Sequence, residues 1–96
     1  MRRYFAGDAA ALRSLRDGEP VTLPSFAPDS DDEADEFEAL TLAAAEGAVV
    51  VTAEVGGDDQ SVTLHDVEAF HLDADGSGDL AWYATQEIDE VLKLLS

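Results

Sequence analysis

The sequence predicts a single small α+β domain over residues 1–96, with about three helices and a mainly antiparallel sheet of about four strands. A chain of 96 residues without a break in composition has room for one hydrophobic core. Helical periodicity occurs near both ends and once in the middle, and several strand-like segments follow one another between residues 48 and 83. Strands that are consecutive in sequence favour antiparallel pairing. Because the chain has no cysteine, packing must supply its stability.

The first strand and the first helix are predicted near the N-terminus. The stretch "RRYFA" at residues 2–6 is short and centred on aromatic residues, which is typical of a strand. Asp8 can cap a helix over residues 9–17, and Gly18 is expected to end it.

An extended connection is predicted over residues 20–28. It contains all three prolines of the chain, which restrict the backbone: Pro20, Pro24 and Pro28. Its apolar side chains are available to pack onto the body of the domain: Val21, Leu23 and Phe26.

A second helix is predicted to begin at residue 31. Ser30 and Glu33 fit the capping box S-x-x-E, and acidic residues crowd the first turn, where the helix dipole favours them. Gly47 is expected to end the helix. Apolar residues recur every three or four positions and are expected to face the core: Ala34, Phe37, Leu40 or Thr41, and Ala44.

The second half of the chain is predicted to form most of the sheet. Residues 48–55 are apolar and β-branched almost throughout, so we expect a central strand buried on both faces, followed by a turn at 56–59. The runs "SVTL" and "VEAFHL" are two strands or one bulged strand. The loop 73–78 then forms a hairpin with a strand over 79–83.

The chain closes with a predicted amphipathic helix, for which Thr85 is the expected cap. Its apolar positions follow the i, i+3, i+4, i+7 pattern of one buried face: Ile88, Val91, Leu92 and Leu95.

Acidic side chains dominate the charge, with 22 Asp and Glu against five Lys and Arg and a net charge of −17. This charge disfavours nucleic-acid binding, because phosphates repel the protein and no counterion release helps it to bind. It serves either as a solvated surface or as a docking face for a basic partner. Four of the five bases lie in residues 1–17 and are interface candidates: Arg2, Arg3, Arg13 and Arg16. We expect an unidentified protein partner, or head-to-tail self-association of the basic end with the acidic remainder.

The loop "DADGSGD" places Asp73, Asp75, Ser77 and Asp79 at alternate positions, as in a calcium-binding loop. An EF-hand also needs a bidentate acid at its twelfth position, which is Ala84 here, and a helix before the loop instead of a strand. The four residues are candidates for a weak calcium site. The alternative is a plain turn, in which the aspartates accept hydrogen bonds from the local backbone.

No catalytic activity and no cofactor are expected. His65 and Asp66 match the first pair of an HD metal site, but the further histidines on helices that such a site needs are missing. His71 is expected to be a half-buried strand residue on the same face as Val67 and Ala69. An enzyme would require a pocket that gathers His71, a tyrosine and two acids within hydrogen-bond reach.

Five aromatic side chains either fill the core or line a small pocket: Tyr4, Phe5, Phe70, Trp82 and Tyr83. Strand positions favour the core for all of them. A pocket, or an aromatic face exposed beside the arginines, would instead indicate a ligand site or a partner surface.

No run of 18 apolar residues is present, and charges interrupt the apolar part of the N-terminal segment. Neither a membrane span nor a signal peptide is therefore expected. We expect the protein to be cytoplasmic.

The order of "MRRYF", "TLPSFAP", "AVVVTAEV" and "VTLHDVEAFHLD" leading into "LAWYATQEIDEVL" resembles a family of uncharacterised actinobacterial proteins, a domain of unknown function. The resemblance extends over most of the chain, is strongest in the last segment, and implies no functional residues. The sequence thus predicts a non-enzymatic domain that acts through protein contact or as an accessory subunit. A weak calcium-binding module and a small-molecule-binding domain are the alternatives.

Overall fold

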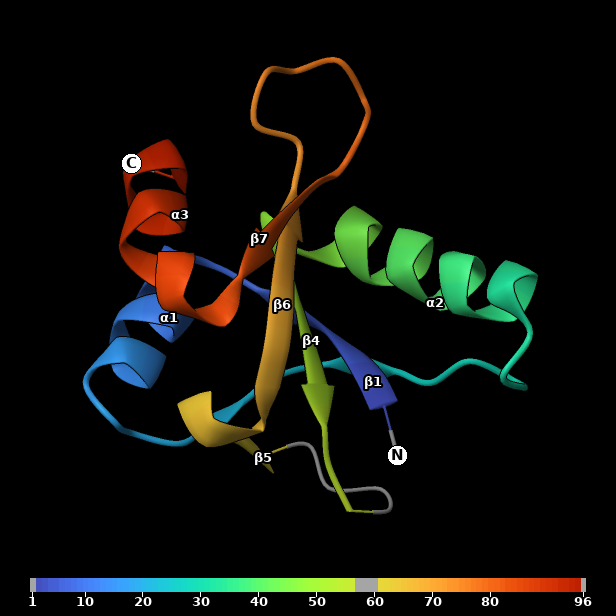
Figure 1. The fold of residues 1–96 in the computed structure, drawn as a ribbon, viewed down its shortest axis with the longest axis horizontal. Coiled ribbons are helices and arrows are strands. Elements are labelled where there is room, and N and C mark those ends of the chain that lie inside the picture. Colours follow the sequence, from blue (N-terminus) through green and yellow to red (C-terminus); the bar gives the residue numbers. More distant parts are fainter. Residues whose placement is uncertain (1, 57–60, 96) are drawn as a thin grey trace.

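Five strands form the main sheet of the computed structural model, which describes residues 2–56 and 61–95 (Figure 1). The sheet is antiparallel throughout, in the order β3-β1-β4-β6-β7. These strands are β1 (Arg2–Gly7), β3 (Ser25–Phe26), β4 (Val49–Glu54), β6 (Val67–Leu72) and β7 (Ala81–Ala84). The predicted α+β fold is confirmed, and β3 adds a strand that the proline-rich connection was not expected to form. The same connection contributes β2 (Val21–Thr22), which pairs with β5 (Ser61–Val62) in a separate small sheet.

Helices cover the two faces of the main sheet unequally (Figure 1). On one face, α1 (Ala9–Arg16) and α3 (Ile88–Leu95) enclose the larger core with side chains from four strands of the main sheet and the small sheet. On the other face, α2 (Glu33–Glu46) packs on β1, β3 and β4 around a smaller core: Tyr4, Ala39, Ala43 and Val50. The part of this second face that belongs to β6 and β7 therefore remains outside the cover of α2.

The strand β4 occupies the centre of the sheet, as predicted. Val49 and Val51 belong to the larger core, whereas Val50 between them belongs to the smaller one. Burial on both faces explains why this segment lacks the alternation of apolar and polar residues that a half-exposed strand would have.

The predicted buried face of α2 is wrong in part: Leu40 and Ala44 pack against the smaller core as predicted, but Ala34 and Phe37 are exposed. Phe37 is 66% exposed, and the buried residues are Ala39 and Ala43. Small side chains at the contact let the backbone of α2 approach β1 closely. Just beyond the helix, the backbone at Gly47 is also close to β1, since a Cβ there would lie 2.7 Å from the carbonyl oxygen of Gly7. Close packing of alanines on the sheet therefore prevails over the periodicity of the larger residues.

Two predicted caps are replaced by neighbouring groups. Asp32 caps α2 by accepting from the backbone N–H of Ala34, so the helix begins at Glu33. The hydroxyl of Ser30 instead accepts from the backbone N–H of Asp32. At the other end of the chain a 3₁₀ turn precedes α3, and Thr85 donates its hydroxyl hydrogen bond to the carbonyl of Val67. The predicted caps of α1 hold: Asp8 accepts from the backbone N–H of Ala11, and Gly18 adopts a positive φ of 86°.

The segments around residue 65 are two separate strands in different sheets, joined by a 3₁₀ turn over Leu64–Asp66. A β-bulge interrupts the pairing of β4 with β6, because Thr52 pairs with Ala69 whereas Ala53 pairs with Val67. Val67 therefore faces the larger core, and the extra residue, Glu68, reaches the face that α2 partly covers. The turn predicted at 56–59 lies, from residue 57 onward, outside the described residues.

Candidate functional site

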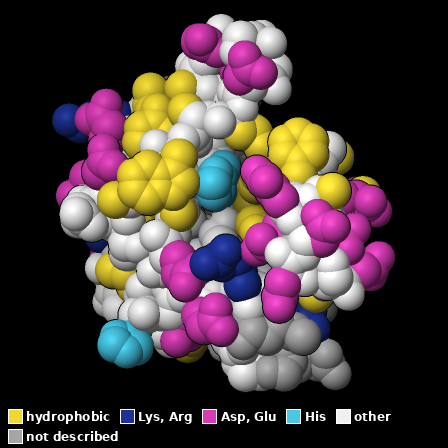
Figure 2. All heavy atoms as spheres, turned by 45° about the vertical axis from the view of Figure 1, so that its right-hand side comes forward, with side chains coloured by type: hydrophobic (Ala, Val, Ile, Leu, Met, Phe, Trp, Pro, Cys, Tyr) yellow, Lys and Arg dark blue, Asp and Glu magenta, His cyan; other side chains and the backbone are white. Residues whose placement is uncertain are grey.

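A groove of about 600 Å³ lies on the part of the sheet that α2 leaves uncovered. We name it the aromatic groove, and its walls and floor are formed by Arg2, Tyr4, Leu40, Thr52, Glu68, Ala69, His71 and Trp82. Figure 2 shows a histidine in this hollow, with hydrophobic side chains on both sides and an arginine below it surrounded by acidic groups. The fold therefore gathers groups from β1, β4, β6, β7 and α2 in one place.

Trp82 is the most exposed aromatic side chain of the groove, with 62% of its surface accessible. It lies on the edge strand β7, directly across from His71 on β6. Its predicted place in the core is wrong, because α2 does not extend over this part of the sheet. Tyr4, Phe5 and Phe70 are buried as predicted.

His71 is half-buried, as predicted, and forms part of the groove. It shares its face with Ala69, but the bulge has turned Val67 to the opposite face. Burial lowers the pKa of His71, because removing the imidazole from water penalises its charged form. Burial therefore favours the neutral form of the imidazole.

Arg2 links the two sides of the groove through two ion pairs. Its Nε donates to Oε1 of Glu68 at 2.9 Å, and its Nη1 donates to Oε1 of Glu36 on α2 at 3.1 Å. The hydroxyl of Tyr4 donates to the same oxygen of Glu36 at 3.3 Å. The charge of Glu68 is the main reason why the pKa of Arg2 is raised. Three elements that are distant in sequence are thus connected by one guanidinium group.

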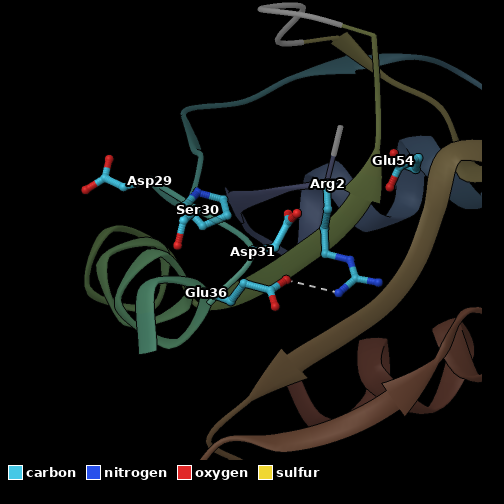
Figure 3. Close-up of a pocket in the computed structure, with 7 residues that line it drawn as sticks. Arg2, Asp29, Ser30, Asp31, Glu36 and Glu54 are labelled. Atoms are coloured by element: carbon cyan, nitrogen blue, oxygen red, sulfur yellow. Dashed lines mark hydrogen bonds and ion pairs between the residues drawn. The ribbon is translucent and has the colours of Figure 1, made fainter. Parts of the chain in front are cut away.

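A second hollow of about 810 Å³ adjoins the groove at Arg2 (Figure 3). We name it the acidic cup; it is lined by Arg2, Pro28, Asp29, Ser30, Asp31, Glu36 and Glu54. Figure 3 shows Asp31, Glu36 and Glu54 arranged around Arg2, whereas Asp29 points away from it. Four carboxylates therefore share a hollow with one guanidinium group.

The four candidate arginines do not form one patch. Arg2 lies between the groove and the cup, and Arg3 donates to the hydroxyl of Ser25. The other two, Arg13 and Arg16, lie on α1 and border a shallow depression beside Lys93 of α3. Arg16 also pairs with Asp89 of α3, at 3.2 Å. Their role in an interface stays a prediction.

The side chains of the aspartate loop accept hydrogen bonds from the local backbone, as expected for the plain turn, and the weak calcium site stays a prediction. Asp73 accepts from the backbone N–H of Gly78, and Asp75 accepts from that of Ser77. The hydroxyl of Ser77 in turn accepts from the backbone N–H of Asp79. The hydrogen bonds from Ser77 lower the pKa of Asp75. Among the described residues, no group of three or more His, Cys, Asp or Glu side chains is arranged to hold a metal ion.

The requirement for a catalytic site is met only in part. The groove gathers His71, Tyr4 and Glu68, and Glu36 is bonded to Tyr4. In residues 2–56 and 61–95, however, the structure has no hydrogen bond between His71 and any of these groups, and both glutamates are paired with Arg2. The other histidine, His65, lies in the 3₁₀ turn that Asp66 caps by accepting from Thr63. The absence of catalysis stays a prediction.

The sequence singled out Arg2 and His71, and it offered Tyr4 and Trp82 as possible pocket residues, but it did not indicate the other members of the site. Glu36, Glu68 and Leu40 carry no motif, and each was expected to be an ordinary helix or strand position. Only the cluster of acids at 29–36 gave a local signal, which was attributed to the start of the helix.

Comparison with protein-family models, with curated proteins and with solved structures found no match for this chain. The actinobacterial resemblance therefore stays an expectation. Within the described ranges, the helices are too short and too polar for any of them to cross a bilayer.

Proposed function

We propose that this chain is a non-catalytic protein-binding module and that its contact surface is the aromatic groove. The observation that carries the proposal is the exposure of Trp82, at 62%, on the half of a sheet face that α2 leaves open. Tryptophan is enriched among the residues that dominate binding energy at protein interfaces. Its large rigid ring also buries much area while losing little conformational entropy.

The floor of the groove gives further support. Thr52 is 5% exposed, and its hydroxyl has no hydrogen-bond partner in the part of the chain that the structure describes. That oxygen is itself removed from solvent, so it does not present a polar group to a bound segment. Leu40 and Ala69 supply apolar surface beside it. The groove thus combines an aromatic wall with an apolar floor, as the centre of a peptide-binding surface does.

A selection with short random peptides tests this proposal. Peptides are selected on the wild-type protein and then measured on Trp82→Ala. We expect binding to change the fluorescence of Trp82, which is the only tryptophan of the chain, and Trp82→Ala to weaken binding about thirty-fold.

Leu94→Ala is the matched control, because Leu94 is a 40% exposed apolar residue on α3, which covers the opposite sheet face. It should leave the affinity unchanged. Peptides that bind Trp82→Ala as tightly as the wild type would refute the proposal, and so would a selection that recovers no binder.

A further inference from the structure

The aromatic groove and the acidic cup are parts of one surface, because Arg2 lines both. On the groove side it pairs with Glu68, and on the cup side it pairs with Glu36. The side chain of Arg2 is 48% exposed, so these pairs are reached by solvent. Exposed ion pairs are weak, so a charged group of a partner can replace one member of such a pair with little loss of free energy.

The cup has more negative charge than Arg2 can neutralise. Asp31 and Glu54 line the cup beside the Arg2 side chain in Figure 3, whereas, of the three carboxylates, only that of Glu36 reaches its guanidinium group. In the described residues, Asp31 forms no hydrogen bond or ion pair. A second cation entering the cup would therefore meet the carboxylate of Asp31, which has no competing partner among the described residues.

From this arrangement we infer that the partner is a cationic segment of another protein, which places an apolar side chain in the aromatic groove and a Lys or Arg side chain in the acidic cup. The inference rests on the proposed function and adds the chemistry of the partner. An apolar side chain stacks against Trp82 and covers Leu40. The cationic group binds the carboxylates of the cup, and Arg is the better fit because its planar group bonds two of them at once.

The net charge of the whole molecule also favours a cationic partner. A net charge of −17 attracts cationic proteins from a distance and accelerates their association. The same charge repels a second copy of this chain and repels nucleic acid. Three of the five bases do meet between α1 and α3, but Asp89 pairs with one of them. A heterologous cationic segment is therefore favoured over self-association.

Two double variants with the same change in net charge test the inference on the peptides selected above. Asp31→Asn with Glu54→Gln neutralises the cup, and Glu38→Gln with Glu46→Gln neutralises two exposed positions of α2 outside both hollows. We expect the selected peptides to be enriched in Lys and Arg. The cup variant should weaken their binding about ten-fold, or about three-fold for each carboxylate, and the control variant less than about two-fold.

The outcomes separate this inference from the proposed function. Peptides that need Trp82 but lack Lys and Arg, or that are weakened equally by both double variants, would overturn the cationic partner while leaving the groove as the binding surface. Self-association of the wild type that Trp82→Ala abolishes, measured by sedimentation, would make a second copy the occupant and would overturn the inference too. Asp31→Asn alone, at an exposed loop position, repeats the test if the double variant does not fold.

Discussion

The orientation of α2 can be tested by replacing Phe37 with alanine. Phe37 is 66% exposed, so only about a third of its surface is removed from water. Full burial of a phenylalanine side chain stabilises a fold by about 1.5–3 kcal/mol, and the buried third therefore contributes about 0.5–1 kcal/mol. Alanine is the better helix former by about 0.5 kcal/mol, which offsets most of this loss. We expect the free energy of unfolding to fall by less than about 0.5 kcal/mol.

The buried face of the helix should be more sensitive to substitution. Ala43 is fully buried in the small core with Tyr4 and Val50, where a larger side chain has no room. We expect Ala43→Leu to lower the free energy of unfolding by about 1–3 kcal/mol, since leucine forms helices nearly as well as alanine and the loss comes from overpacking. Phe70→Ala, at a fully buried position of β6, is the positive control and should lose about 3–5 kcal/mol.

Urea unfolding followed by circular dichroism at constant ionic strength measures these differences. Urea is uncharged, so it leaves the self-repulsion of a chain with a net charge of −17 unscreened, whereas guanidinium chloride would screen it. A loss of about 3 kcal/mol in Phe37→Ala together with a neutral Ala43→Leu would refute the reasoning. Phe37 would then face the core, as the spacing of the apolar residues indicates.

Gly47→Ala should lower the free energy of unfolding by about 1–3 kcal/mol in the same assay, because the added Cβ would lie 2.7 Å and 2.8 Å from the backbone oxygen and nitrogen of Gly7. Gly56→Ala is the control, since Gly56 has open space around it, and an equal loss there would contradict this explanation. Below the ordinary histidine pKa of 6.5, the unfolded chain binds a proton at His71 more readily than the folded protein does, since burial lowers the pKa in the fold. The free energy of unfolding should therefore decrease as the pH falls from 6.5 toward that lowered pKa, and His71→Gln should remove this part of the pH dependence. Identical pH profiles of the wild type and His71→Gln would show that His71 is not buried in this way. Because Asp73 already accepts a backbone hydrogen bond, millimolar calcium should shift the melting temperature no more than magnesium does; a calcium-specific shift that Asp73→Ala abolishes would instead establish a binding site.

Much of the fold was predictable because it depends on neighbours in sequence. The apolar run at 48–55 identified the central strand, and the spacing of Ile88 and Val91 identified the buried face of the last helix. Asp8 and Gly18 marked the ends of the first helix. In each case one side-chain pattern or one local hydrogen bond determines the structure, so no distant contact was needed to infer it.

The candidate site was mostly beyond prediction, since it depends on which distant elements meet. Arg2 and Glu68 are 66 residues apart, and the bulge that turns Glu68 toward Arg2 arises from the pairing of β4 with β6. Trp82 is exposed because α2 does not extend over β7. No local pattern indicates either event.

The sequence by itself determined the kinds of elements, their order and most of their ends, because hydrophobic period, turn residues and caps act within a few residues. The tertiary structure alone decided how α2 is rotated, where the sheet slips in register and which side chains share a hollow. The physical reason is that α2 has apolar residues on more than one side, so its local free energy scarcely distinguishes its faces. The close fit of Ala39 and Ala43 against the sheet does distinguish them. That fit leaves Trp82 uncovered beside a cup of carboxylates, the arrangement on which the proposed binding depends.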